Sequence, residues 1–164
     1  MKLRKISQKQ EKDVAKELGG RTVVASGAFW GAKGDVRSDE FLVECKTTQN
    51  AWYVIHAKTW EKIEQEAIRD RLKRPVLVVD LNSGAKRIAV FSPHDFYKDI
   101  KDVPYEYIDM RCNVQKTFRI NTRMFTYNSN GIIFSIHGQR KNILHAISFN
   151  YFKEVIANGI EQYI

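Results

Sequence analysis

Residues 25–49 read ASGAFWGAKGDVRSDEFLVECKTTQ and predict two short strands joined by a tight polar turn. The second strand, FLVECK, alternates so that Glu44 and Lys46 share one face. A turn centred on residues 39–40 would place Asp35 directly opposite Glu44. Opposed carboxylates, with Cβ atoms about 4.5–5.5 Å apart, destabilise a strand pair, so this pair predicts a bound cation. Oxygen ligands of this kind suit Mg²⁺, with Mn²⁺ as a substitute.

The chain has 164 residues, a length typical of one domain with a substantial core, and we predict a single domain over residues 1–164. No apolar run approaches the roughly 20 residues that a membrane helix needs. The basic start lacks the apolar segment of a secretory signal. Two cysteines are too few for a disulfide framework or a Cys-based zinc site. We therefore expect a reduced, cytoplasmic protein with no membrane partner.

The charge balance predicts an acidic partner. The formal net charge is +8, which is typical of proteins that bind nucleic acid. Residues 111–153 contain seven Lys or Arg and no Asp or Glu. A segment of this length without a carboxylate favours contact with phosphates, while ordinary solvated charge is the alternative.

The segment before the hairpin predicts an acidic helix face. Residues 7–18 form the expected first helix, with Ser7 as N-cap and two glycines as its stop. Helical spacing puts Glu11 on the same stripe as the apolar Val14. A carboxylate on an inward face needs a partner, and the carboxylates of the hairpin suggest one. The alternative is that Glu11 extends to water at the helix edge.

The remaining chain predicts alternating helices and strands. The expected elements are a helix over 58–72, a buried strand over 75–81, a strand over 86–91, a helix from 92 to about 100, an alternating segment over 115–125, a hairpin of 132–137 with 143–149, and a helix over 150–163. Residues 50–56 predict a short extended piece or a loop. This order favours an α/β fold with a central mixed β-sheet flanked by helices.

A glycine-rich loop over residues 26–34 precedes the hairpin. It lacks the Gly-Lys-Ser/Thr ending of a phosphate-binding P-loop. Its aromatic residues, Phe29 and Trp30, either lie under a nucleic-acid backbone or pack on the core, and the residues do not separate these alternatives.

Glu11, the Gly34-Asp35 pair and the Glu44-Cys45-Lys46 triplet with Gln49 together resemble the PD-(D/E)xK nuclease superfamily. Within it, the pattern is most similar to archaeal-type Holliday-junction resolvases and their phage relatives. The similarity covers about residues 5–81 and implies a restriction-endonuclease-like core over about 5–100, with residues 101–164 as an additional C-terminal β-hairpin and helix. One departure is that Lys33-Gly34 stands where the family has a proline before the aspartate.

The resemblance implies metal-dependent hydrolysis of a DNA phosphodiester. Mg²⁺ would be held by Asp35 and Glu44, with Glu11 and the backbone carbonyl of Cys45 as further ligands. Lys46 would orient the attacking water or neutralise charge on the phosphate. The remaining implied roles are Gln49 as a positioning residue of the active site, and Ser26, Lys33, Arg37, Arg119, Arg123, Arg140 and Lys141 as DNA contacts.

Three functions follow from this reading. The first is a Holliday-junction resolvase that acts as a homodimer, since two symmetric sites suit a junction with near two-fold symmetry. The second is a restriction- or repair-type endonuclease on other duplex DNA. The third is a catalytically inactive DNA-binding module of the same fold, which the intact acidic residues and Lys46 disfavour. A bacterial or phage-infected host cell is the expected setting.

Overall fold

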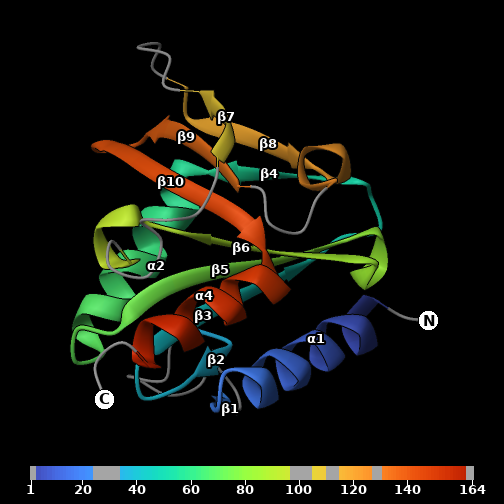
Figure 1. The fold of residues 1–164 in the computed structure, drawn as a ribbon, viewed down its shortest axis with the longest axis vertical. Coiled ribbons are helices and arrows are strands. Elements are labelled where there is room, and N and C mark those ends of the chain that lie inside the picture. The colour runs from blue at the N-terminus through green and yellow to red at the C-terminus, as the bar shows by residue number, and fades with distance from the viewer. Residues whose placement is uncertain (1–2, 24–33, 97–104, 110–114, 127–130, 162–164) are drawn as a thin grey trace.

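The computed structural model of the protein describes residues 3–23, 34–96, 105–109, 115–126 and 131–161 (Figure 1). The glycine-rich loop, with the candidate DNA contacts Ser26 and Lys33, lies outside the described residues, as do residues 97–100 of a predicted helix. No described helix is long and apolar enough to cross a membrane.

The described elements form two sheets and three α-helices. The large sheet contains β1 (Arg21–Thr22), β2 (Val36–Arg37), β3 (Phe41–Thr47), β5 (Arg74–Leu81), β6 (Lys86–Phe91), β7 (Tyr105–Asp109), β9 (Gly131–His137) and β10 (Lys141–Ser148). The small sheet pairs β4 (Trp52–His56) with β8 (Thr117–Asn121). The helices are α1 (Leu3–Glu17), α2 (Ala57–Arg69) and α4 (Phe149–Glu161), with 3-10 turns η1 (Asn82–Gly84), η2 (Pro93–Phe96) and η3 (Thr122–Phe125).

The large sheet is mixed and follows the order β1-β2-β3-β5-β6-β10-β9-β7. Neighbouring strands are antiparallel except β3 with β5 and β7 with β9, which are parallel. Helices α1 and α4 pack on one face, and α2 packs with the small sheet on the other (Figure 1). This arrangement confirms the predicted fold class, a central mixed sheet flanked by helices. Because β10 pairs with β6, strands on both sides of residue 100 belong to the same sheet.

Strand β5 lies between these two layers, which explains its nearly continuous apolar sequence. Val76 and Val78 are fully buried against the α1 and α4 layer. Leu77 and Val79 are fully buried on the opposite face, against α2 and the small sheet. The strand is therefore the centre of both hydrophobic cores, and its parallel partner β3 carries the candidate catalytic residues beside it.

The β2–β3 hairpin has the predicted register. Val36 is paired with Val43 and Arg37 with Leu42, so the turn is centred on residues 39–40. Asp35 immediately precedes the last pair, and its backbone N–H donates to the carbonyl of Val43 at 2.9 Å. The hairpin therefore brings Asp35 beside the part of β3 that carries Glu44.

Several local predictions need correction. Helix α1 begins at Leu3, and Ser7 lies inside it, where its hydroxyl donates to Glu11 at 3.2 Å and does not cap the helix. Of the two alternatives for residues 50–56, the extended one is confirmed, since residues 52–56 form a strand that pairs with β8. The alternating segment 115–125 is a strand only to Asn121, whose side chain accepts from the backbone N–H of Arg123 at 3.0 Å and starts η3.

Candidate active site

Strand β3 presents Glu44 and Lys46 on the face that α2 covers. The period of two along the strand puts both side chains on this face, and Lys46 Nζ donates to Glu44 Oε1 at 2.7 Å. The Glu44 side chain is 18% exposed and that of Lys46 is 37% exposed. Both line a groove of about 450 Å³ that also contains Lys58 and Thr59 from the start of α2. The pair is therefore sheltered on the strand side and open to solvent through the groove.

Asp35 is held against the same strand by the backbone. Its Oδ2 accepts the N–H of Cys45 at 2.8 Å. Burial raises the pKa of Asp35 to about 6, and the Glu44 carboxylate adds to the rise. The Cys45 N–H and the Lys46 ammonium oppose the rise, and Glu11 contributes a smaller upward effect on the pKa. Glu44, Lys46 and Glu11 therefore all act electrostatically on Asp35, while an acidic cluster that holds a metal stays a prediction.

Helix α1 brings Glu11 toward this cluster through its neighbour Gln10. The Gln10 side chain is 1% exposed, and its Nε2 donates to the backbone carbonyls of Lys46 at 2.9 Å and Val78 at 3.3 Å. Glu11 itself is half-buried. Gln10 thus links α1 to both β3 and β5. The sequence analysis missed it, although Gln10 lies four residues before Val14 and therefore on the buried face of the helix.

The donor set fits a hard divalent cation. Carboxylate oxygens are the ligands that Mg²⁺ prefers. Asp35 is bound to the backbone of β3 at Cys45, the residue next to Glu44. Among the described residues, no three Asp, Glu, His or Cys side chains are near enough to hold a metal ion together. Asp35 and Glu44 are therefore the two candidate ligands, and ligation by Glu11 or by the Cys45 carbonyl stays a prediction.

The backbone at Gly34 explains why proline does not precede Asp35 in this chain. Its φ is +75°, which a proline ring cannot adopt. A Cβ at this position would lie 2.8 Å from Leu42 Cδ1. Entry into the hairpin at Asp35 therefore requires glycine here, and proline is excluded.

Gln49 and Cys45, two other residues of the predicted site, lie apart from the acidic side chains. Gln49 is exposed in the turn after β3, and no hydrogen bond among the described residues joins it to the acidic cluster. The Cys45 side chain is 4% exposed within the core. Burial and the surrounding carboxylates raise the pKa of its thiol well above the ordinary value, so the thiol stays protonated and inert.

Tyr53 is a site residue that the sequence analysis did not identify. It lies on β4 and is half-buried. Burial raises the pKa of Tyr53, the Lys46 ammonium lowers it, and the Glu44 carboxylate raises it. The phenol is therefore under the electrostatic influence of the Glu44–Lys46 pair. Its place depends on the pairing of β4 with β8, which has no local signal in the sequence.

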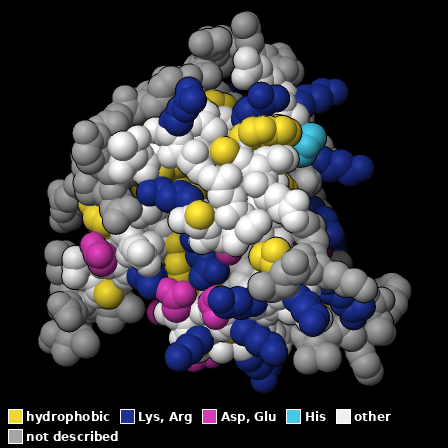
Figure 2. All heavy atoms as spheres, turned by 90° about the vertical axis from the view of Figure 1, so that its right-hand side faces the viewer, with side chains coloured by type: hydrophobic (Ala, Val, Ile, Leu, Met, Phe, Trp, Pro, Cys, Tyr) yellow, Lys and Arg dark blue, Asp and Glu magenta, His cyan; other side chains and the backbone are white. Residues whose placement is uncertain are grey.

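The candidate DNA contacts are dispersed over the structure. Arg37 forms an ion pair with Asp70, and its side chain is 30% exposed. Arg119 lies over the Trp52 ring, with its guanidinium carbon 4.7 Å from the ring centroid. Arg123 is exposed in η3. Figure 2 shows Lys and Arg side chains spread across one face of the molecule, with Asp and Glu confined to smaller groups.

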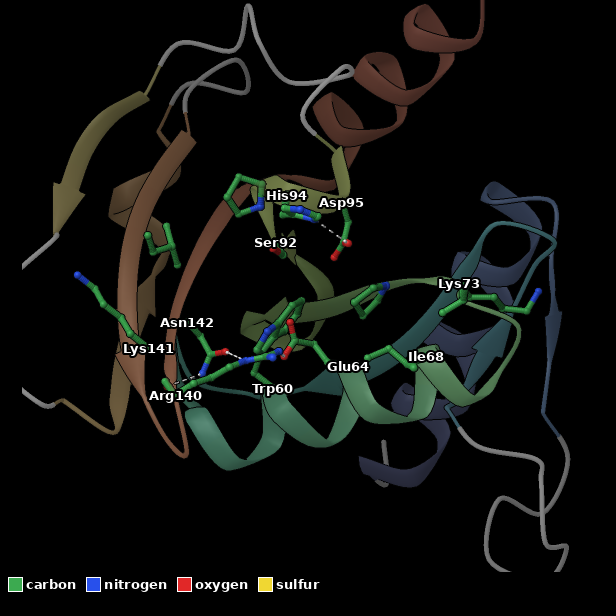
Figure 3. Close-up of a pocket in the computed structure, with 14 residues that line it drawn as sticks. Trp60, Glu64, Ile68, Lys73, Ser92, His94, Asp95, Arg140, Lys141 and Asn142 are labelled. Carbon is green, nitrogen blue, oxygen red and sulfur yellow. Dashed lines mark hydrogen bonds and ion pairs between the residues drawn. The ribbon is translucent and has the colours of Figure 1, made fainter.

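Arg140 and Lys141 line a second groove, of about 550 Å³, between α2, η2 and the start of β10 (Figure 3). Arg140 forms an ion pair with Glu64, and its Nε donates to Asn142 Oδ1 at 3.3 Å. Lys141 points away from Glu64 (Figure 3). Arg140 is thus held by protein partners on α2 and β10, while Lys141 is exposed. Their roles as DNA contacts stay predictions.

The pKa of Asp35 predicts a pH-dependent change in stability. A carboxyl whose pKa is raised on folding binds its proton more tightly in the folded state, so stability falls as the pH rises from about 4 to 6. Asp35→Asn removes this cost and keeps an acceptor for Cys45 N–H. We expect the variant to melt a few °C above the wild type at pH 7.5 in EDTA, a shift on the order of 1 kcal/mol.

Melting curves from pH 4 to pH 8 test this expectation. The difference between variant and wild type should shrink as the pH falls from 6 toward 4, because Asp35 is protonated in the folded wild type there and the unfolded chain begins to bind the same proton. Because both proteins share every other titrating group, the comparison isolates Asp35. A difference that does not change with pH would show that the carboxyl is not destabilised by its surroundings.

Comparison with known proteins gives a structural likeness to a solved structure. No protein-family model and no curated protein sequence matches the chain. The structure is similar to that of Hjc, a Holliday junction resolvase from the archaeal hyperthermophile Archaeoglobus fulgidus, with 17% sequence identity and a TM-score of 0.45. The similarity covers 71% of this chain and 87% of Hjc. At this identity and TM-score the likeness says nothing about individual side chains.

Proposed function

We propose that the protein is a metal-dependent DNA endonuclease that hydrolyses phosphodiester bonds. The observation that carries the proposal is the placement of three charged groups on one strand pair. Asp35 is bound to the backbone of β3 at Cys45, and the Glu44–Lys46 pair lies on the adjoining part of that strand, in an open groove. Two carboxylates beside one lysine can hold a divalent cation and meet a phosphate in the same place.

Each residue has a defined part in this chemistry. A bound Mg²⁺ would supply Lewis-acid polarisation of the phosphate and a more acidic water. Asp35 and Glu44 would hold the cation, and the Cys45 N–H keeps the Asp35 carboxylate oriented. Lys46 now donates to Glu44, and this ammonium is within reach of charge that develops on a phosphate oxygen. Glu11 adds negative potential from α1.

The substrate we propose is DNA, with the four-way junction as the first candidate and a homodimer as the acting form. The formal net charge of +8 and the acid-free segment 111–153 favour a polyanionic partner. A restriction- or repair-type nuclease on other duplex DNA is the alternative within the same chemistry.

A DNA-binding module without cleavage is a second candidate, and one observation favours it. Glu44 is already paired with Lys46. In a binding module this ion pair would be permanent. In an enzyme, Glu44 would hold a divalent cation together with Asp35, and the Lys46 ammonium would face the substrate.

Cleavage of matched substrates tests the proposal. Purified protein should nick a synthetic four-way junction in Mg²⁺ and leave it intact in EDTA, as judged on a denaturing gel. A linear duplex of the same sequence is the control. Faster cutting of the junction supports the resolvase, and equal cutting supports the alternative nuclease. Binding without cleavage in Mg²⁺ and in Mn²⁺ would establish the inactive module.

A further inference from the structure

The small β4–β8 sheet has one buried face and one solvent face. Register pairs Val54 with Arg119, and side chains alternate along both strands. Ile55, Phe118 and Ile120 turn inward and are buried with α2 and β5. Trp52 and Arg119 lie on the solvent face, where both are exposed.

Trp52 and Arg119 stack against each other on that face, and we call this pair the platform. The Trp52 side chain is 41% exposed, one of the few large apolar residues in the described chain that the fold leaves in water. The Arg119 guanidinium lies over its ring at 4.7 Å from the centroid. An exposed pair of this kind contributes only about 0.5–1 kcal/mol to stability, so stability alone is a weak reason to keep tryptophan there.

The charge around the platform favours an anionic ligand. Residues 50–58 and 115–126 contain no Asp or Glu. These two segments carry exposed basic residues, namely Lys58, Lys116, Arg119 and Arg123. An aromatic plane among cations is the combination that binds single-stranded nucleic acid, because the base stacks on the ring and the backbone meets the positive charge.

The platform follows the candidate catalytic strand in the chain. Strand β4 follows β3 after the turn of residues 48–51, so Trp52 comes six residues after Lys46. Alternation puts Tyr53 on the inner face and Trp52 on the outer face of the same strand. A nucleotide bound at Trp52 would therefore lie one short turn of the chain from the strand that carries Glu44 and Lys46.

We propose that Trp52 and Arg119 stack an unpaired base of the DNA substrate next to the cleavage site. The inference rests on the proposed function and deepens it, since it names the substrate class as DNA that exposes unpaired nucleotides beside the cut. Bases inside an intact duplex are already stacked on their neighbours and cannot use the platform. A fully paired junction or duplex would then be a poorer substrate than one with a gap, flap or splayed branch.

Binding measured in EDTA tests the platform without cleavage. Fluorescence anisotropy would compare a labelled oligo-deoxythymidine with a duplex hairpin. Trp52→Ala should weaken single-strand binding by roughly 5- to 150-fold, the effect of losing one base–aromatic stack, and should change duplex binding little. Trp52→Phe should retain most of the affinity. Leu72→Ala, which alters a residue that is 78% exposed and lies outside the platform, should bind as the wild type does.

Photochemical cross-linking of the wild-type protein tests the same inference without any substitution. Ultraviolet cross-linking of oligonucleotides with 5-iododeoxyuridine, followed by peptide mass spectrometry, should place the adduct on Trp52. Unchanged single-strand affinity in Trp52→Ala, equal losses for duplex and single strand, or adducts only elsewhere would overturn the inference.

Cleavage then separates this inference from the proposed function. Wild-type protein in Mg²⁺ should cut a junction with two unpaired nucleotides at its branch faster than a fully paired one, and Trp52→Ala should remove that preference. Cutting without a preference would overturn the platform and leave the nuclease. Trp52-dependent single-strand binding with no cleavage of any substrate would overturn the nuclease and leave the platform.

Discussion

Asp35→Asn, Glu44→Gln and Lys46→Met should each lower the rate of DNA cleavage by roughly 10³-fold, which corresponds to about 4 kcal/mol of lost transition-state stabilisation. The two amides keep the shape of the carboxylates but remove the charge that holds a divalent cation. Methionine keeps the length of Lys46 without its ammonium. Each change therefore removes one charge from a group of three side chains. In this group Lys46 donates to Glu44 at 2.7 Å, and Asp35 accepts the backbone N–H of Cys45.

Binding should survive these changes. In EDTA, affinity for the junction should stay within a few-fold for Asp35→Asn and Glu44→Gln, because removing an anion beside DNA does not weaken phosphate contacts. Asp39→Asn is the matched control, since Asp39 is exposed in the same hairpin turn, and it should cleave as the wild type does. Full activity in Asp35→Asn or Glu44→Gln would refute the site, and equal losses in Asp39→Asn would show a general defect of the hairpin.

Arg87→Met should lower the free energy of unfolding by about 3–5 kcal/mol, because it leaves a buried carboxylate without its partner. The Asp80 side chain is 3% exposed. Arg87 donates to it twice, from Nε at 2.7 Å and from Nη2 at 3.0 Å. The same guanidinium reaches Glu17 on α1 at 3.3 Å and lies 5.6 Å from the ring of Phe149 on α4. One side chain thus links the central strands to both helices of that face.

Urea unfolding curves would measure the loss. Lys153→Met is the control, because Lys153 also pairs with Glu17 but does so at the partly exposed edge, where an ion pair contributes at most about 1 kcal/mol. Adding Asp80→Asn to Arg87→Met should recover part of the stability, since it removes the unpaired buried charge. No recovery would mean that packing of the Arg87 stem, and not its charge, carries the effect.

Local patterns in the chain were enough to predict the centre of the candidate site. The turn at residues 39–40 and the alternation of β3 set both the hairpin register and the shared face of Glu44 and Lys46, since a shift of one residue would bury Glu44 and Lys46. The unbroken apolar run of β5 predicted a strand buried on both faces. These features depend on neighbours a few residues apart, so the sequence carries them directly.

Such local patterns could not predict contacts between segments that are distant in the sequence. Strand β4 has regular structure because it pairs with β8. Residues 57–116 separate these two strands in the sequence. That pairing puts Arg119 over Trp52 and helps bring Tyr53 under the electrostatic influence of Lys46. Gln10 acquired its role in the same way, by meeting the carbonyls of Lys46 and Val78. The periodicity of a segment shows which of its faces is buried. Which other segment packs against that face is decided only when the whole hydrophobic core forms.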